Sequence, residues 1–405
     1  MSDHTSASRE AALAELRYQQ EQARARLGIV VPIGHGDTLQ GALQKAGERE
    51  SQSSIRGDWI HSSGFKYPTH TERLRWARTR EIITRSSPGA DEDSSYLEIV
   101  ARQAASVEMI LRGEQGDQHN TRNAAICDHV LLGTFPTINP DAFARRHRDF
   151  FFVLLSAGLI EFVYQAAKAA VLSWKPVMPG GGAAAFKSEP EDVEAVLAEN
   201  PLPVSLLGMT LQAYLFRGLP RAVGYSPPPR NYQLPLQILT NCNERFIVAH
   251  EYGHTLHDAL DVVHPGASVI EEEFAADIFA FHLVVASGRV LDLMPPNFST
   301  QGAYFTLTAL DIIRQALDLV RYGEIREDRG FAGHPPVAHR LERLRQCYLQ
   351  TVSNRDDALS IRPALSAART LQLLWSRLRK EGAEEKWPGC ELHRIWKGVA
   401  TGIPN

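Results

Sequence analysis

Residues 245–257 read RFIVAHEYGHTLH and place two histidines, His250 and His254, four positions apart. Residues with this spacing share one face of a helix, so both imidazoles can reach a single metal ion. Glu251 follows the first histidine and lies close enough to take a proton from a metal-bound water without binding the metal. Apolar residues 246–249 predict a buried helix, where histidines and a carboxylate need partners. On this motif alone, the alternative of two ordinary helix histidines stays open.

A second acidic segment, VIEEEFAADIFAFHLVVA at residues 269–286, follows the histidines. Catalytic zinc sites commonly take three protein ligands and keep one position for water, so we expect a third ligand downstream. Glu273 and Asp277 are four residues apart and share a helical face, with Glu273 expected to bind the metal. Asp277 is expected to orient a ligand histidine through its other ring N–H. The alternative, a solvated acidic face, fits Glu271 and Glu272 well but fits Asp277 badly, because apolar residues surround it.

The two segments together resemble the ImmA/IrrE family of metallopeptidases. That family's active helix typically reads RxxFxxAHExGH, to which RFIVAHEYGH is similar, and its second signature, ExxA(N/D)xFA, is similar to EFAADIFA. The resemblance implies a zincin-like fold with one Zn²⁺ per chain, held by His250, His254 and Glu273. It implies Glu251 as the general base and Asp277 as the residue that supports the ligands.

The segment ILTN at residues 238–241 has a β-like composition and resembles the edge strand of that family. We therefore expect a strand at about residues 236–239. Such a strand would hold an extended substrate by β-addition, in which the substrate's backbone pairs with the edge of a sheet.

A third segment, GHPPVAHRLERL at residues 333–344, resembles the HPPxxxRI tail of the HtpX and CAAX-prenyl-protease group. The resemblance implies that His334 and Arg340 approach the site from outside the metal ligands and stabilise the developing oxyanion. The alternative is a helix start capped by prolines and followed by an ordinary surface arginine.

The chain as a whole predicts an α+β fold, mostly helical, with a small mixed sheet in the metallopeptidase domain. We expect a helix near residues 7–27, a loop or linker over 29–70, and a long helix that begins at Asn139-Pro140 and reaches Trp174. Further helices are expected over residues 243–260, 269–287 with Gly288 as the stop, 302–322, 336–352 and 362–381. The corresponding division of the chain is an N-terminal helix and linker (1–65), a small helical domain (66–120), a helical region and linker (121–200), the metallopeptidase domain (201–350) and a C-terminal helical extension (351–405).

The small helical domain is similar to a repressor-type helix-turn-helix, which many ImmA/IrrE proteins carry or pair with. Residues 71–82 would form the first helix and residues 96–116 the second and third. The spacing of the recognition helix, SxxxIxxxExG, is matched by Ser106, Ile110, Glu114 and Gly116. DNA binding is weakly supported, because that helix offers only one arginine beside two glutamates. A degenerate domain that binds protein, or a plain helical bundle, is the alternative.

Composition sets the compartment and excludes several classes. With 43 basic and 47 acidic residues, the net charge of −4 predicts no global attraction to nucleic acid or to a membrane. Four scattered cysteines make a disulfide framework or a cysteine-based zinc site unexpected. The N-terminus lacks the pattern of a signal peptide. The apolar stretch 150–174 is interrupted by Glu161, Gln165 and Lys168 and is expected to be a buried core helix rather than a membrane span.

These features predict a cytoplasmic zinc-dependent endopeptidase that hydrolyses a peptide bond in a specific regulatory protein. A repressor or a stress or defence partner is the leading candidate for that protein substrate. Two alternatives remain: a transcriptional regulator that cleaves nothing, and an interaction scaffold with a structural metal. Structural zinc usually has four protein ligands, which favours the enzyme, since only three are expected here.

Overall fold

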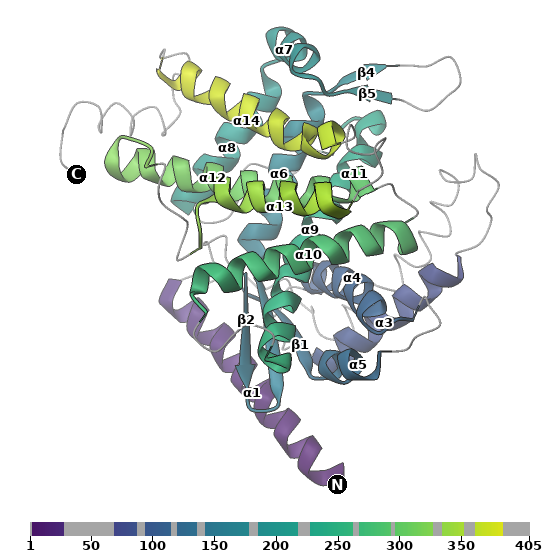
Figure 1. The fold of residues 1–405 in the computed structure, drawn as a ribbon. Helices are drawn as coiled ribbons and strands as arrows, with labels where there is room; N and C mark the ends of the chain where they lie inside the picture. The colour runs from purple at the N-terminus through teal and green to yellow at the C-terminus, as the bar shows by residue number, and fades with distance from the viewer. Residues whose placement is uncertain are drawn as a thin grey trace.

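The structure is a computed structural model, mostly helical with a small mixed sheet (Figure 1). It describes residues 2–27, 69–86, 94–114, 120–135, 142–177, 185–217, 227–261, 267–292, 296–326, 334–351 and 361–383. The linker expected over residues 29–70 therefore lies almost entirely outside the described residues.

The N-terminal part combines four helices with a three-stranded sheet. Its helices are α1 (Ser2–Leu27), α3 (His70–Ser86), α4 (Ser94–Leu111) and α5 (Thr121–Asp128). Its strands are β1 (Val130–Phe135), β2 (Ala142–His147) and β3 (Phe150–Ser156).

The remaining elements are mainly helices. They begin with α6 (Ala157–Leu172), the short strands β4 (Lys175–Val177) and β5 (Ala185–Lys187), α7 (Pro190–Glu199) and α8 (Leu202–Arg217). They continue with α9 (Arg230–Leu260), α10 (Val269–Leu291), α11 (Pro296–Ser299), α12 (Gln301–Tyr322), α13 (Val337–Thr351) and α14 (Ile361–Ala383). The expected helices near 7–27, 269–287, 302–322, 336–352 and 362–381 are confirmed within a few residues, although α10 continues through Gly288 to Leu291.

The three-stranded sheet has the order β1-β3-β2. Strand β3 pairs in parallel with β1 and antiparallel with β2, with Ala142 opposite Leu155. Alternate residues of β3 enter two different apolar clusters, since side chains alternate between the faces of a strand. One face joins the main core, and the other packs against Ala12 and Leu16 of α1.

The main core is one continuous cluster that runs from Ile82 in α3 to Leu378 in α14. Helix α9 lies at its centre and contacts α4, α6, α10 and α12. The segments expected as a separate small helical domain and as the metallopeptidase domain thus share the same core.

The long helix expected from Asn139 to Trp174 is wrong in its first half. Residues 142–147 and 150–156 form an antiparallel pair of strands, and the helix begins only after Ser156, whose side chain accepts a hydrogen bond from the backbone N–H of Leu159. Asn139 and Pro140 themselves lie outside the described residues. Short apolar runs such as FFFVLLS fit a buried strand as well as a buried helix, and here two neighbouring strands decide the outcome.

The strand expected at residues 236–239, with ILTN at 238–241, is also wrong. These residues belong to α9, which begins at Arg230 and contains Pro235 near its N-terminal end. Leu236 and Leu239 are buried, and their spacing of three matches one face of a helix. Pro235 is the sixth residue of the helix, beyond the first turn, so it removes one backbone hydrogen bond that burial of Leu236 and Leu239 must offset.

Residues 94–111 form one helix where the helix-turn-helix interpretation required two. Ser106, which matched the recognition-helix spacing, is buried in the core instead of facing solvent. Glu108 and Arg112 are buried as well, so the polar residues of this segment point into the protein. Helix α4 therefore supports the central helices, which it contacts directly.

Among the described residues one helix, α10, is long and apolar enough to cross a membrane by length and composition, and 56% of its most apolar window is buried within the protein. A buried core helix passes the same test. The stretch 150–174, expected to be buried, is buried almost throughout, as strand β3 followed by α6.

Helices α9 and α12 approach each other closely at Gly302, and this contact generates a prediction. A β-carbon added to Gly302 would overlap the backbone of Cys242 and Asn243. We expect Gly302→Ala to lower the free energy of unfolding by about 1–3 kcal/mol, because backbone atoms cannot move aside easily. Alanine is otherwise the better helix former by ~1 kcal/mol. Denaturant unfolding measures the change, and a stabilised variant would contradict the close approach.

Candidate metal centre

The site lies where α9 packs against α10, and this packing brings polar side chains of the two helices together. Gly253, inside the HEYGH motif, lies against Ala276 of α10. A β-carbon on Gly253 would be 3.1 Å from the Ala276 Cα and 3.3 Å from its Cβ. Glycine destabilises a helix, but at position 253 its lack of a side chain allows α10 to approach closely. The small side chain of Ala276 allows the same on the other helix.

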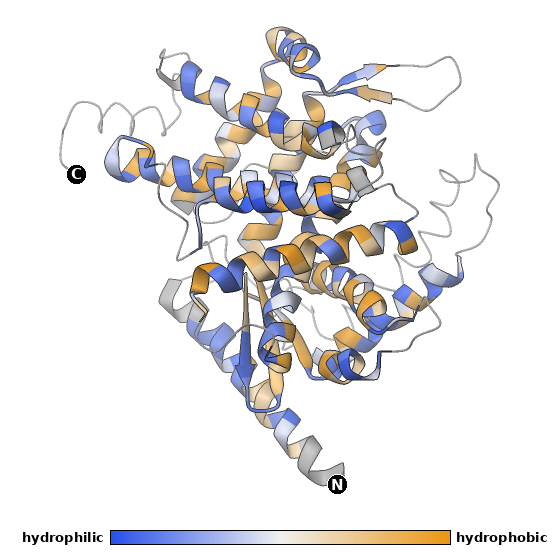
Figure 2. Ribbon diagram, viewed as in Figure 1, coloured by the Kyte–Doolittle hydropathy of each residue, from blue (hydrophilic) through white to orange (hydrophobic). Residues whose placement is uncertain are grey.

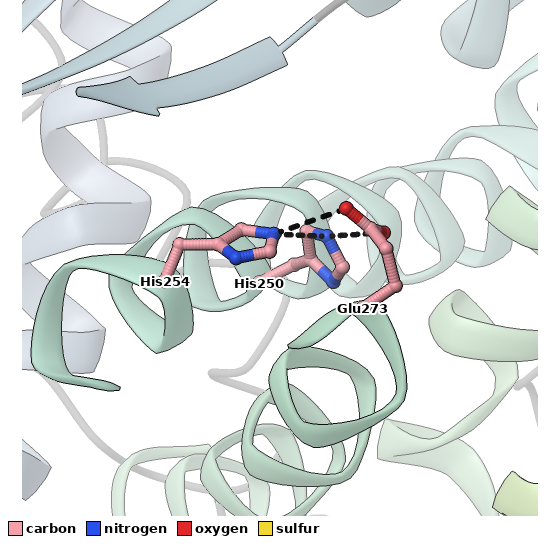
Figure 3. A group of neighbouring side chains, drawn as sticks. All are labelled: His250, His254 and Glu273. Atoms are coloured by element: carbon pink, nitrogen blue, oxygen red, sulfur yellow. Dashed lines mark hydrogen bonds and ion pairs between the residues drawn. The ribbon is translucent and has the colours of Figure 1, made fainter. Parts of the chain in front are cut away.

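His250, His254 and Glu273 converge at this contact, as Figure 3 shows. Their candidate ligand atoms all lie within 4.8 Å of one another. The Nε2 atoms of the two histidines are 3.1 Å apart, and each is 3.4 Å from a carboxylate oxygen of Glu273. The two histidines come from α9 and the carboxylate from α10 (Figure 3). These three residues form a group that could hold a metal ion.

The surroundings of His250 fit a metal ligand. Its Nδ1 lies 3.0 Å from Oδ1 of Asp277, a carboxylate with no exposed side-chain surface. A proton on Nδ1 that faces Asp277 leaves the lone pair of Nε2 directed toward His254 and Glu273, as a metal ligand requires. The structure therefore places Asp277 where the sequence predicted it, behind the first histidine.

The electrostatics of the site favour positive charge. Burial alone would lower the pKa of His250, but the adjacent carboxylates of Asp277 and Glu273 outweigh burial and raise its pKa to about 10. Burial opposes ionisation of Glu273 too, yet the two ligand histidines hold the pKa of its carboxyl far below the usual value. Glu273 and Asp277 are thus two ionised carboxylates in a buried group. Positive charge stabilises them, either a proton on His250 or a bound metal ion.

Arg340 lies in the site, where it lines the same pocket as Glu251 and His334, and its expected role as an oxyanion donor stays a prediction. Its Nε and Nη2 each donate to a different oxygen of Asp277 at 2.6 Å, and Nη2 is 3.7 Å from Glu273. Both partners are buried. The guanidinium thus clamps the carboxylate that orients His250, and it holds the pKa of Asp277 low against the effect of burial. The alternative of an ordinary surface arginine is wrong.

His334 reaches the same site from the segment that precedes α13. Its Nε2 is 3.3 Å from Oε2 of Glu273, and its side chain is 31% exposed. His334 also lines a pocket with His250 and Glu251. Partial exposure beside the candidate ligands allows this imidazole to contact a molecule that enters the pocket.

Glu251, the expected general base, is buried and lines that pocket. The rest of the pocket wall is largely apolar and comes from β2, α6, α9, α12 and the start of α13. It includes Ala142, Leu159, Phe246, Ile247, Leu307, Leu310, Pro335 and Val337. An acidic group in an apolar pocket next to a candidate metal site is the arrangement that proton transfer to and from a bound molecule requires.

Sequence reasoning missed the support that α4 provides to α9, the helix that carries His250 and His254. The hydroxyl of Tyr252, within HEYGH, donates to Oε1 of Glu108 at 2.7 Å. Arg85 and Arg112 donate to the same carboxylate, at 2.5 Å and 3.3 Å. Glu108 has no exposed side-chain surface. Helical spacing predicts that Tyr252 faces away from His250 and His254, but no local signal in the sequence names its partner 144 residues earlier.

His257, one turn beyond His254, is not in the group. His257 packs edge-on against Phe279, at 5.7 Å between ring centroids. Burial lowers the pKa of His257, and the nearby His254 and His250 lower it further. His264 lies outside the described residues.

A scan of protein-family models, a search of curated proteins and a search of solved structures each find no match for this chain.

The support of His250 by Asp277 generates a prediction on metal affinity. We expect Asp277→Asn to weaken binding of a divalent ion such as Zn²⁺ by about 10- to 100-fold, because the neutral amide orients and polarises His250 less. Competition with a chromophoric chelator measures the affinity. Glu272→Gln, which changes an exposed carboxylate on the same helix, is the control and should bind the ion as the wild type does. Equal affinities for all three proteins would contradict the role of Asp277.

The contact between Tyr252 and Glu108 generates a prediction on stability. We expect Tyr252→Phe to lower the free energy of unfolding by about 1.5–3 kcal/mol, since it removes a hydrogen bond to a buried charge. Tyr304→Phe is a matched control, because the buried hydroxyl of Tyr304 has no hydrogen-bond partner among the described residues. Denaturant unfolding of both variants should show a loss for Tyr252→Phe and little change, or a gain, for Tyr304→Phe.

Proposed function

We propose that this protein is a zinc-dependent endopeptidase with His250, His254 and Glu273 as metal ligands. The observation that carries the proposal is the convergence of these three side chains within 4.8 Å, beside a buried carboxylate that lines a pocket. Two imidazoles and a carboxylate form a donor set that suits zinc. The resemblance of RFIVAHEYGH and EFAADIFA to the ImmA/IrrE signatures supports the same assignment.

The chain's own residues divide the chemistry between them. When bound, zinc lowers the pKa of a coordinated water and polarises the carbonyl of the substrate. The Glu251 carboxylate accepts the proton of the attacking water and delivers it to the nitrogen of the leaving amine. His334, partly exposed at the pocket, donates a hydrogen bond to the carbonyl oxygen as negative charge develops there. Arg340 acts through Asp277 and His250, because its donors bind Asp277.

Strand β2 replaces residues 236–239 as the proposed docking edge for the substrate. It is an edge strand of the three-stranded sheet, it contacts α9, and its first residue, Ala142, lines the pocket with His250 and Glu251. An extended peptide that pairs with β2 would run past the candidate ligands. The resemblance to ImmA/IrrE proteins favours one regulatory protein of the cytoplasm, such as a repressor or a defence partner, as the source of that peptide.

One observation favours a second function, an interaction protein with a structural metal. His334 is 3.3 Å from the Glu273 carboxylate and could serve as a fourth protein ligand, which would close the site. His334→Ala separates the two functions. An enzyme keeps its zinc and loses most of its activity, whereas a closed structural site loses zinc affinity.

Elemental analysis combined with a peptide-cleavage assay tests the proposed function. We expect about one zinc per chain, lost or much weakened in His254→Ala and Glu273→Ala because each change removes one of three ligands. Glu251→Gln should keep its zinc and lose cleavage of a randomised peptide library by at least about 100-fold, as expected for loss of a general base. His257→Ala, one turn from the site, is the control and should keep both properties. Failure of the wild type to bind zinc would contradict the proposal.

A further inference from the structure

Strand β2 is apolar at its start and basic at its end, and this difference determines which substrates fit the proposed docking edge. Figure 2 shows that β2 is hydrophobic at its start and hydrophilic at its end. Its sequence is AFARRH, and Arg145 and Arg146 are exposed. Arg148, in the turn that follows, is exposed as well.

Alternate residues of β2 face opposite sides of the sheet. The ring of Phe143 lies 5.4 Å from that of Phe135, and the ring of His147 stacks 5.7 Å from that of Phe152, in the cluster covered by α1. Ala142 and Ala144 pack against the main core on the other face, the side of α9. Of the residues on this face, Ala142 lines the pocket that His250 and Glu251 also line.

The two ends of β2 lie beside two different parts of α9. Ala142 shares the pocket with Ile247, His250 and Glu251. At the other end, Nη1 of Arg146 is 3.9 Å from Oδ1 of Asp258, one turn beyond His254. Strand β2 therefore runs along the metal-binding helix in the direction of that helix.

The far end of β2 carries excess positive charge. Arg145, Arg146 and Arg148 are exposed there, against the carboxylates of Asp149 and Asp258. The contact between Arg146 and Asp258 is long, and both side chains are about half exposed. Such a pair contributes little. Nε of Arg146 also donates to the backbone carbonyl of Arg148 at 3.2 Å, and the guanidinium lies 5.6 Å from the Phe151 ring, which orients the group while its Nη atoms can still reach a second carboxylate.

The distance between Ala142 and Arg146 along β2 sets the spacing between the two substrate residues that would contact them. The four steps from Ala142 to Arg146 span about 13 Å, at ~3.3 Å per residue. Antiparallel pairing is the more stable and more common arrangement of two strands. A peptide antiparallel to β2 passes Arg146 first and reaches the pocket about four residues later in its own sequence.

We infer that the substrate of this site is an extended segment with an acidic residue about four positions before an apolar residue. The apolar side chain enters the pocket beside Glu251, and the acidic side chain pairs with Arg146. This inference rests on the proposed peptidase function for cleavage, but the docking itself does not require cleavage.

Binding of labelled ten-residue peptides to the zinc-loaded Glu251→Gln protein tests the docking without turnover. The peptides share one apolar residue and carry Glu or Lys four positions before it, and a third peptide carries the Glu four positions after it. We expect the first peptide to bind about two- to fivefold more tightly than the other two, which is the range that one exposed charge pair provides. The preference should weaken as salt is added. Fluorescence polarisation measures the affinities.

Variants of Arg146 in the same background assign the preference to β2. Arg146→Glu should reverse the preference between the Glu and Lys peptides, and Arg146→Gln should abolish it. Arg369→Glu, an exposed arginine on α14, is the matched control and should keep it. Because Arg146 is exposed, we expect all variants to retain the circular dichroism spectrum and zinc content of the parent.

The outcomes separate this inference from the proposed function. Equal binding of the three peptides, or a preference that survives Arg146→Glu, overturns the inference even if the wild type cleaves peptides. A preference that follows Arg146 in binding supports the docking. If the wild type then cleaves none of the bound peptides, the proposed peptidase function fails while the docking surface stands.

Discussion

The close approach of α9 and α10 at Gly253 and Ala276 is the contact on which the site depends. With no side chain on one helix and a single methyl group on the other, the two backbones come near enough for Glu273 to reach the histidines of α9. The same approach places Asp277 behind His250. A larger residue at either position would separate Glu273 on α10 from the two histidines on α9.

Buried, paired charges contact α9 on two opposite faces and fix its position. On the ligand side, Arg340 clamps Asp277, which in turn faces His250. On the opposite side, Tyr252 bonds to Glu108, a carboxylate that two arginines neutralise. Charges this deeply buried are tolerated only when they are paired, so each network restricts where α9 can lie. The N-terminal helices are thus part of the support of the site.

The site and the fold were predictable to different extents. The spacing of His250, His254, Glu273 and Asp277 identified a group that the structure brings together, because helical periodicity is a local property. The strands β2 and β3 were not predicted. The apolar run of β3 fits a buried helix as well as a buried strand, and its pairing with β1 and β2 is a long-range contact that the local sequence does not show. The helical start of α9 was also missed. Its short β-like composition predicted a strand, but Leu236 and Leu239 are buried together on one face of a helix.

By itself, the sequence determined which residues could bind a metal ion and which helices carry them. Residue type and helical spacing depend only on residues a few positions apart, so both can be read from a short segment. Tertiary structure alone decided three other matters. It assigned the partner of Tyr252, made Arg340 a support of Asp277, and placed β2 along the pocket. Each of these joins segments far apart in sequence, and only the packing of the whole core specifies which distant residues meet.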